Sequence, residues 1–253
     1  MIFDLQKASV WKRTSAWMFD IILLGILIAG LAFGMSRAFG YDDYAQSLND
    51  AYDRYEQQYG TSFNLTQEAY LQLTPEQQKT YDEAYDALIE DPEAMHAYSM
   101  MISLSLTITS LSILAGYVIW ELAVPFFLGN GQTLGKKIFG IGVIRTDGVK
   151  LSPVQLFIRT ILGKYTIETM VPVLIVLMIY FGTLGLLGTV LILGLGILQI
   201  VLLVATPNHA PLHDVLAGTV VCDLASQMIF ESREAMLEYK KEVSAEAAAR
   251  APY

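Results

Sequence analysis

Long uncharged runs alternate with polar segments along the chain. Residues 16–38 carry charges only near the two ends of the run, residues 98–120 carry none, and residues 169–213 contain no Asp, Glu, Lys or Arg. A helix needs about 20 mostly apolar residues to cross a bilayer. The third run is long enough for two crossings, and glycines between positions 182 and 188 predict a turn that divides it. We therefore predict an all-α membrane protein with four transmembrane helices.

The bulk composition agrees with a membrane protein. The 253 residues are 54% hydrophobic and 16% charged, with a mean hydropathy of +0.44, which is too apolar for one soluble domain. The first apolar run resembles a signal peptide, but Asp20 inside it and the later runs argue against cleavage, so we interpret it as a retained helix. Cys222 is the only cysteine, so no intramolecular disulfide is possible.

Charge is distributed unevenly, and its distribution predicts the orientation in the membrane. Residues 41–97 contain 13 acidic and 2 basic residues, whereas residues 129–165 contain 6 basic residues and 1 acidic residue. Lys and Arg near span ends stay on the cytoplasmic side. We therefore expect a multi-pass protein of the cell membrane, with both termini and the basic loop in the cytoplasm and the acidic segment outside.

Composition divides the chain into six segments. They are the N-terminus with the first span (residues 1–40), an acidic Tyr-rich segment (41–97), the second span (98–128), a basic Gly-rich loop (129–165), the third and fourth spans (166–206), and a closing motif with a C-terminal helix (207–253). Tyrosines and one leucine recur every three or four residues, which predicts one face of a helix; they are Tyr41, Tyr44, Leu48, Tyr52, Tyr55 and Tyr59. Thr74, Pro75 and Gln77 form a capping-box pattern that begins a second helix. Together they predict an extracytoplasmic helical hairpin.

The basic loop has a different local pattern. Asp147-Gly148 lies between two short β-prone runs, which predicts a small cytoplasmic β-hairpin. Residues 217–221 form another β-prone run, which could pair with this hairpin. Ser152 and Pro153 begin a helix over residues 154–163 that we expect to lie at the inner membrane surface before the third span.

Two motifs in the inner segments suggest ligands. Gly131-Gln-Thr-Leu-Gly-Lys-Lys137 resembles a phosphate-binding loop, but the first glycine is misplaced and Lys137 replaces the required Ser or Thr. We expect Lys136 and Lys137 to contact lipid headgroups instead. His209, His213 and Asp214 resemble metal ligands, but a polar cluster at a helix end fits them better. We expect no metal and no cofactor.

A carboxylate inside an apolar run is costly and needs a partner or a function. Asp20 shares a helix face with Arg13, two turns away, which is too far for a direct ion pair. We expect Asp20 to pair with Arg159 or a lysine, and Arg13 to pair with Asp214 or Glu121. The cluster would lie at the cytosolic end of the spans, either as a structural latch or as a proton-carrying site.

The second span carries a polar stripe that ends at Glu121. Its members share one helical face: Ser99, Ser103, Thr107, Ser110 and Tyr117. Such residues commonly join helices to one another in lipid. A polar track along a water-filled cavity is the alternative, and the sequence leaves both open.

These motifs resemble those of the RDD family of membrane proteins, named for an arginine and two aspartates. Arg13 and Asp20 match the first two positions, residues 131–145 resemble the Gly-rich loop, and residues 212–221 resemble the closing motif with Asp214 as the second aspartate. The resemblance covers the chain apart from the Tyr-rich segment and the C-terminal tail. The Tyr-rich segment is longer than the first outer loop expected for the family.

The resemblance implies two functions of different classes. One is a monovalent cation/proton antiporter, in which Asp20 and Asp214, with Glu121 as a further candidate, bind a proton or a cation. Arg13 and Arg159 would tune their pKa values or form a structural ion pair. The other is a regulatory or scaffolding subunit that binds a membrane or extracytoplasmic partner protein. We expect a homo-oligomer or a membrane partner, no nucleic acid, and no enzymatic activity, because no catalytic constellation is present.

Overall fold

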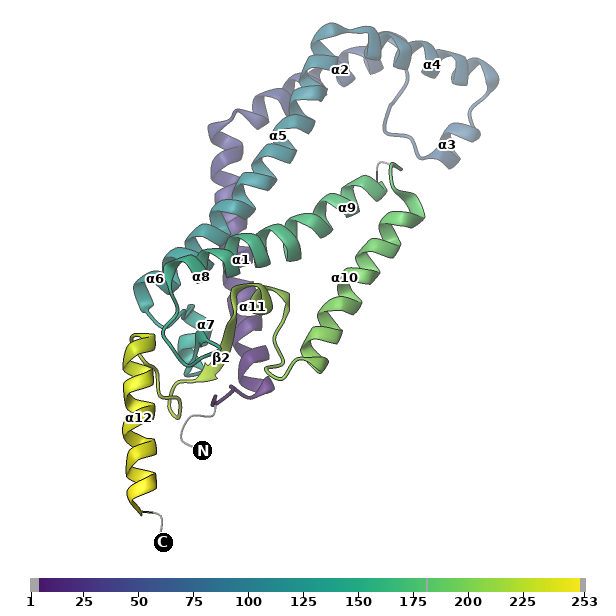
Figure 1. Cartoon of the computed structure of the whole chain (residues 1–253). Helices are drawn as coiled ribbons and strands as arrows, with labels where there is room; N and C mark the ends of the chain where they lie inside the picture. Colours follow the sequence, from purple (N-terminus) through teal and green to yellow (C-terminus); the bar gives the residue numbers. More distant parts are fainter. Residues whose placement is uncertain (1–4, 181, 251–253) are drawn as a thin grey trace. The chain divides into compact units, whose positions relative to one another are not determined.

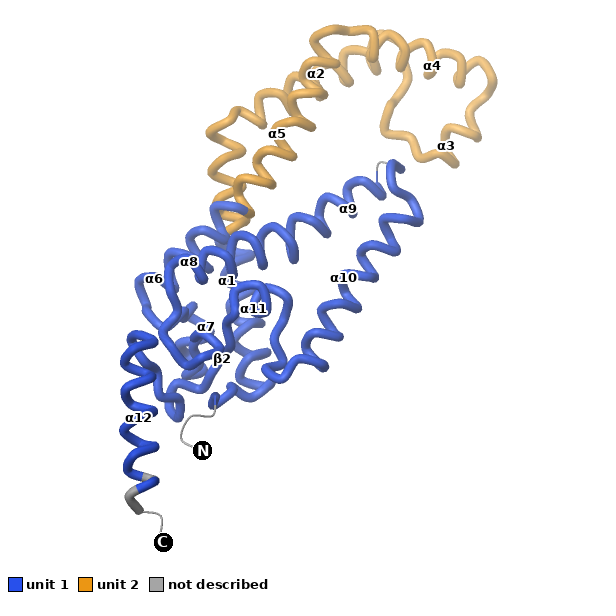
Figure 2. Tube along the Cα trace, in the orientation of Figure 1, with its two compact units in different colours: residues 1–27, 114–253 blue, residues 28–113 orange. Residues whose placement is uncertain are grey.

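The computed structural model describes residues 5–180 and 182–250. The chain forms two compact units (Figures 1 and 2). The first comprises residues 1–27 and 114–253, and the second comprises residues 28–113. The candidate site lies in the first unit.

Four helical segments of the described chain are long and apolar enough to cross a membrane. They are Val10–Ala38, Pro92–Leu128, Pro153–Tyr180 and Gly185–Ala205. Most of their large apolar side chains are exposed, as expected for surfaces that face lipid rather than water. The prediction of four helices with the length and apolar character of membrane spans is confirmed.

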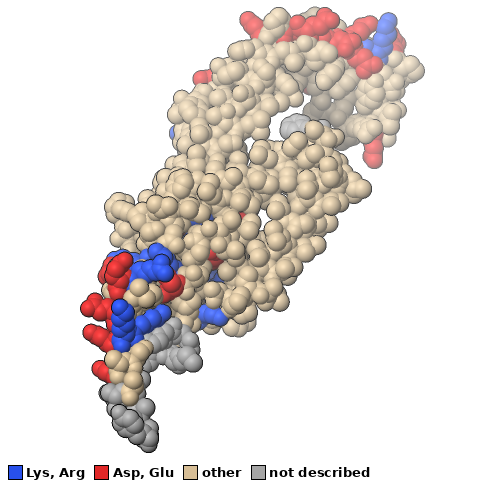
Figure 3. Space-filling model, in the orientation of Figure 1, with Lys and Arg blue, Asp and Glu red and all other residues tan. Residues whose placement is uncertain are grey.

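The second unit contains the helical hairpin that the sequence predicts. Its elements are the end of α1 (Val10–Ala38), α2 (Tyr41–Tyr59), α3 (Gln67–Leu71), α4 (Pro75–Glu90) and most of α5 (Pro92–Tyr117). The capping box of α4 forms: the Thr74 hydroxyl accepts from Gln77 N, and the Gln77 side chain accepts from Thr74 N. The visible acidic side chains of this unit gather over α2 and α4 (Figure 3).

Leucine and alanine form the buried core of this hairpin, and aromatic rings cover it. The buried members are Leu48, Ala51, Leu88, Ala94 and Ala97. Tyr52, Tyr55 and Phe63 are half-buried and pack against them. The Asp91 carboxylate accepts from the backbone N–H groups of Glu93 and Ala94, which begins α5 as the sequence predicts.

The first unit contains a two-stranded antiparallel sheet of β1 (Ile141–Arg145) and β2 (Thr219–Asp223), with Val143 opposite Val221. The predicted Asp147-Gly148 turn forms, and Gly148 has a φ of 85°. The return strand of the predicted hairpin does not form, because Lys150 N donates to Phe230 O instead of continuing the ladder. Only isolated bridges remain there. The hairpin prediction is therefore corrected to a β1–β2 pair.

The third span includes the helix that we expected to lie separately on the membrane surface. Helix α8 (Pro153–Phe157), the π-helix η2 (Ile158–Met170) and α9 (Val171–Tyr180) form one continuous helix. The expected boundary at residue 165 therefore falls inside a helix. The helix continues through Gly163, where the lack of a side chain lets it pack closely against His213. A Cβ at this position would lie 2.5 Å from the His213 Cβ.

The remaining elements complete the first unit. They are the π-helix η1 (Val118–Ala123), α6 (Val124–Leu128), α7 (Leu134–Ile138), α10 (Gly185–Ala205), α11 (Leu212–Ala217) and α12 (Arg233–Arg250). The predicted glycine turn between α9 and α10 is present, with Gly182 and Gly185 at positive φ. The Gly188 backbone packs on Ile179, where a Cβ would lie 2.6 Å from Cγ1. This contact brings α10 back along α9.

Candidate functional site

A cavity of about 610 Å³ lies within the first unit, between α1, η1, η2, α10 and α11. Eleven ionisable side chains line it, and they come from segments far apart in the sequence. They are Arg13, Asp20, Tyr117, Glu121, Lys136, Arg159, Lys164, Glu168, His209, His213 and Asp214. Four are carboxylates and four are Arg or Lys, so the lining has no net charge when His209, His213 and Tyr117 are neutral.

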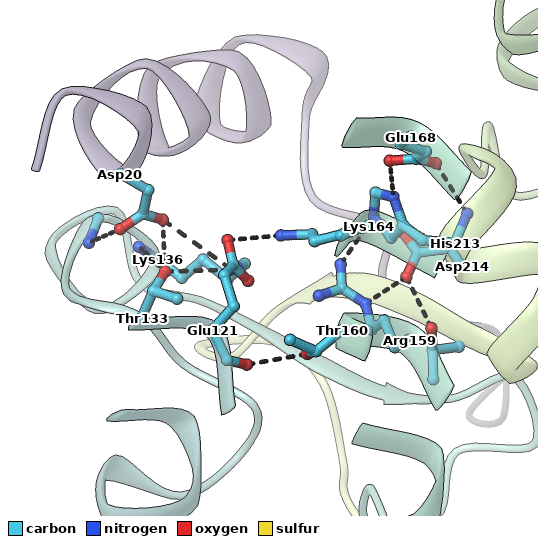
Figure 4. A network of polar contacts seen from close by, with 12 residues as sticks. Asp20, Glu121, Thr133, Lys136, Arg159, Thr160, Lys164, Glu168, His213 and Asp214 are labelled. Carbon is cyan, nitrogen blue, oxygen red and sulfur yellow. Dashed lines mark hydrogen bonds and ion pairs between the residues drawn. The ribbon is translucent and has the colours of Figure 1, made fainter. Parts of the chain in front are cut away.

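Most of these charged side chains are linked by hydrogen bonds and ion pairs into one network (Figure 4), and Asp20 lies at one end of it. Its carboxylate accepts from the Thr133 hydroxyl and, at 2.9 Å, from Gly135 N, at the start of α7. The Lys136 Nζ lies 3.9 Å from Asp20 Oδ2. A Cβ at Gly135 would lie 2.5 Å from Ala16 O, so only glycine allows α7 to approach α1 this closely.

Glu121 lies at the centre of the network, between two lysines. Its Oε1 is 2.6 Å from Lys164 Nζ, and its Oε2 is 3.7 Å from Lys136 Nζ. Oε2 is buried and makes no hydrogen bond with the described residues. Burial lowers the pKa of Lys136 to about 8, although Glu121 and Asp20 both favour the ammonium. Lys136 thus bridges two carboxylates, and part of its population is neutral slightly above physiological pH.

Arg159 and Asp214 form the other end of the network. Arg159 Nε lies 2.7 Å from Asp214 Oδ1, which also accepts from the Thr219 hydroxyl at 2.6 Å. The two charged residues are 3% and 1% exposed. Burial by itself would raise the pKa of Asp214, but Arg159, His213 and the two hydrogen bonds hold it below its usual value. This pair is a fully formed buried salt bridge.

His213 joins Glu168 to this pair. Its Nδ1 lies 2.8 Å from Glu168 Oε2, its backbone N donates to Glu168 Oε1, and its Nε2 lies 3.2 Å from an Arg159 terminal nitrogen. Burial lowers the pKa of His213, and Asp214 opposes this while Arg159 reinforces it. A neutral imidazole that donates from Nδ1 to Glu168 and accepts at Nε2 from Arg159 satisfies both ring contacts.

The π-helical winding of η2 places its charged residues around the cavity. Arg159 and Lys164 are five residues apart, the hydrogen-bond spacing of a π-helix, so the wider winding brings them closer to one face than an α-helix would. Glu168 follows four residues later. Glu121 lies in the second π-helix, η1, and its backbone carbonyl accepts from the Thr160 hydroxyl of η2. Two π-helices therefore meet at the network, and π segments commonly mark functional sites.

The structure brings together most of the predicted site residues but pairs them differently. Asp20 pairs with a lysine, one of the two expected partners, whereas Arg159 pairs with Asp214. Arg13 lines the cavity and feels the charge of Asp214, but it makes no ion pair within 4.0 Å among residues 5–180 and 182–250. Asp20 and Asp214 lie at opposite ends of the network (Figure 4).

One sequence-based assignment is corrected, and four participants were missed. Lys136 is buried in the network and is unavailable to lipid headgroups, whereas Lys137 is exposed. The missed participants are Thr133, Lys164, Glu168 and Gln199. The five-residue spacing of Arg159 and Lys164 was the available signal, but it indicates a shared face only when π winding is assumed. Within the described ranges, no group of three or more His, Cys, Asp or Glu residues is arranged to hold a metal.

Comparison with known proteins agrees with the motifs. No curated protein and no solved structure matches the chain significantly. The sequence does match the RDD family over residues 7–218, which include Arg13, Asp20 and Asp214 and the whole charge network. The chain therefore belongs to the RDD family of membrane proteins.

Proposed function

We propose that this protein exchanges a monovalent cation for a proton, and that Asp20, Glu121 and Lys136 form the exchange site. One observation carries the proposal: the buried Lys136 ammonium lies between two carboxylates, at 3.9 Å from Asp20 and 3.7 Å from Glu121. A buried ammonium in this position occupies the place that a metal cation would take. A lysine can leave that place by losing a proton.

The exchange follows from the atoms around Lys136. When Nζ loses its proton, three oxygens remain around the vacated charge: Asp20 Oδ2, Glu121 Oε2 and the Thr133 hydroxyl, which lies 3.1 Å from Nζ. Oxygen ligands of this kind suit a hard monovalent cation. The Lys164 ammonium keeps neutralising Glu121, so one bound cation replaces one released proton. Return of the proton to Lys136 expels the cation.

This mechanism assigns Asp214 a different role from the one expected at first. Arg159 Nε and the Thr219 hydroxyl both donate to its Oδ1, and the permanent charge of Arg159 already neutralises the carboxylate. We propose that Asp214 and Arg159 hold α11 against η2, and that Glu121 takes the place of Asp214 as the second ion ligand. Arg13 and His213 would then set the electrostatic field of the cavity rather than carry the ion.

Liposomes with purified protein test the exchange. A preset pH gradient is challenged with sodium, lithium and potassium, and the wild type is compared with Lys136→Gln and with Lys137→Gln, an exposed neighbour of equal charge. We expect Lys136→Gln to lower exchange at least tenfold, because it removes the titrating group, and Lys137→Gln to leave it unchanged. Equal rates in the two variants, or no flux above protein-free liposomes with folded protein, would refute the proposal.

We further propose that both termini face the cytoplasm. Four crossings would place Lys7, β1 and β2 on the same side of the membrane. This supports the proposal, because β1 pairs with β2 and Lys7 forms a β-bridge with Cys222 of β2. In a Cys222→Ala background, cysteines introduced at the exposed positions Ser62 and Ser244 would be labelled from opposite sides by a membrane-impermeant maleimide. Labelling of both from outside intact cells would reject this orientation.

A regulatory or scaffolding role is the second candidate. Tyr85 on α4 is 48% exposed, and an exposed aromatic side chain is a common anchor at protein interfaces. A photo-crosslinking residue at position 85 would then capture one defined membrane or extracytoplasmic partner in cells. The same residue at Gln58, also exposed on the hairpin, serves as the control, and identical products from both positions would argue against a specific interface.

A further inference from the structure

The cavity that contains the charge network is far larger than one desolvated cation requires. Its volume of about 610 Å³ equals roughly 20 waters at about 30 Å³ each. It also falls within the range of about 300–1,000 Å³ that is typical of sites for organic ligands. A second occupant of organic size is therefore compatible with the space.

One wall of the cavity is apolar and belongs to helices that cross the membrane. Trp17, Ile21 and Leu24 contribute it from α1, and Leu203 contributes it from α10. Trp17 is 59% exposed, and Ile21 and Leu203 are also exposed. An apolar wall continuous with lipid-facing surfaces is suited to a hydrocarbon chain rather than to water.

The lining also contains two groups of opposite charge whose bonding capacity is incomplete. Glu121, which is 6% exposed, has an oxygen with no hydrogen bond, and Arg13 makes no ion pair with the described residues. A buried acceptor without a donor is costly, and a guanidinium offers five N–H donors. A cationic N–H donor would satisfy the free oxygen of Glu121, and an anionic oxygen acceptor would satisfy Arg13.

We propose that this cavity binds a phospholipid with a zwitterionic phosphoethanolamine headgroup. The headgroup ammonium would donate to Glu121 Oε2, its phosphate would accept from Arg13, and the acyl chain would lie against Trp17, Ile21 and Leu203. Because the lining carries no net charge, it favours a headgroup that also carries none. A primary ammonium is required, since a trimethylammonium group has no N–H to donate. The headgroup ammonium would use the same Glu121 oxygen that faces Lys136 and the exchanged cation, but lipid binding itself does not require ion exchange.

Lipid binding to the purified, delipidated full-length protein tests the proposal without any ion gradient. The probes are dioleoyl phosphatidylethanolamine, phosphatidylcholine and phosphatidylglycerol in detergent micelles, together with soluble phosphoethanolamine. Native mass spectrometry and thermal shift report binding. We expect phosphatidylethanolamine to bind at least tenfold more tightly than either other lipid, because each of them lacks one of the two headgroup interactions.

Two variants that leave the buried network intact locate the site. Arg13→Ala should weaken phosphatidylethanolamine binding about tenfold through the lost charge-assisted bonds, and Trp17→Ala should weaken it through lost chain contact. Arg37→Ala, on the same helix but outside the cavity lining, should have no effect. Equal binding of the three lipids, or equal effects of Arg13→Ala and Arg37→Ala, would overturn the proposal. Equally tight binding of soluble phosphoethanolamine would overturn the assignment to a lipid.

The results that would refute ion exchange differ from those that would refute lipid binding. Loss of flux in all variants leaves the lipid measurements unaffected, because they are made at equilibrium without a membrane. Conversely, absence of lipid selectivity leaves the effect of Lys136→Gln on flux in place.

Discussion

Asp214 and Arg159 form the most deeply buried ion pair of the network. Asp214 accepts from Arg159 Nε at 2.7 Å and from the Thr219 hydroxyl at 2.6 Å, and it is 1% exposed. Removing one partner of such a pair leaves the other charge buried without compensation, which costs more than the intact pair contributes. The residue is therefore expected to govern stability.

Asp214→Asn should lower the free energy of unfolding by about 3–5 kcal/mol. The native pKa of Asp214 lies below its ordinary value of 3.8, so its contribution is fully present above that value and is lost as pH falls further. Thermal unfolding in detergent between pH 7 and pH 3 checks this. Below about pH 4 the difference between wild type and variant should shrink; a constant difference would exclude this assignment. Glu231→Gln, at an exposed ion pair with Lys150, is the control and should change little.

Lys136 changes its charge in a higher pH range than Asp214 does. Its native pKa of about 8 lies below the ordinary 10.5, so the folded protein holds this proton less firmly than the unfolded chain does. Folding stability should therefore rise as pH increases from about 8 towards 10.5, with the sign opposite to that of a lysine stabilised by its partners.

Competition between this proton and sodium gives a second prediction. Sodium chloride, compared with choline chloride, should raise the melting temperature at pH 9 more than at pH 6, because neutral Lys136 leaves its position open to the cation. In Lys136→Gln the sodium effect should be independent of pH. A sodium effect with the same pH dependence in both proteins would assign the titration to another group.

Helix η2 supplies three of the cavity's charged residues and packs on α11 through one glycine. A Cβ at Gly163 would lie 2.8 Å from the His213 Cα and 2.5 Å from its Cβ, and these backbone-level atoms cannot rotate away. Close approach here determines whether Arg159 can reach Asp214. The packing of two elements thus controls the electrostatics of the site.

Gly163→Ala should separate η2 from α11 and destabilise the protein by about 1–3 kcal/mol, the usual cost of overpacking. Gly194→Ala on α10 is the matched control, since nothing lies within 4 Å of the added Cβ. That change should be neutral or slightly stabilising, because alanine favours helix more than glycine does. The melting temperatures of the two variants test this prediction. Equal values would show that η2 and α11 are not tightly packed at Gly163.

Several elements could be predicted from the sequence because their signals are local. Uncharged length predicted the spans, and Thr74 with Gln77 predicted the start of α4. The β-prone run at residues 217–221 was expected to be able to pair with the hairpin, and β2 does pair with β1. The missing return strand and the winding of η2 could not be derived, since both depend on contacts between residues far apart in the chain. The same limit applies to the site: the sequence identified Asp20 and Glu121, but Lys136 reaches them only because Gly135 lets α7 approach α1.

For the whole molecule, the charge balance of the cavity matters more than any one pair. The four carboxylates offset Arg13, Lys136, Arg159 and Lys164, and neutral His209 and His213 add no charge. Replacement of the Lys136 proton by one monovalent cation keeps this balance. The proposed cycle therefore moves no net charge across the membrane.

Exchange should consequently be independent of membrane potential. One uncompensated charge crossing the bilayer would shift the equilibrium by about 2.3 kcal/mol per 100 mV, about fiftyfold, which flux measurements resolve easily. Sodium/proton exchange is measured in liposomes whose potential is set by potassium gradients and valinomycin, at zero and at 100 mV of either sign. Equal rates are expected at all three potentials. Rates that follow the sign of the potential would mean that a second group, with His213 the first candidate, releases or binds a proton in the same cycle.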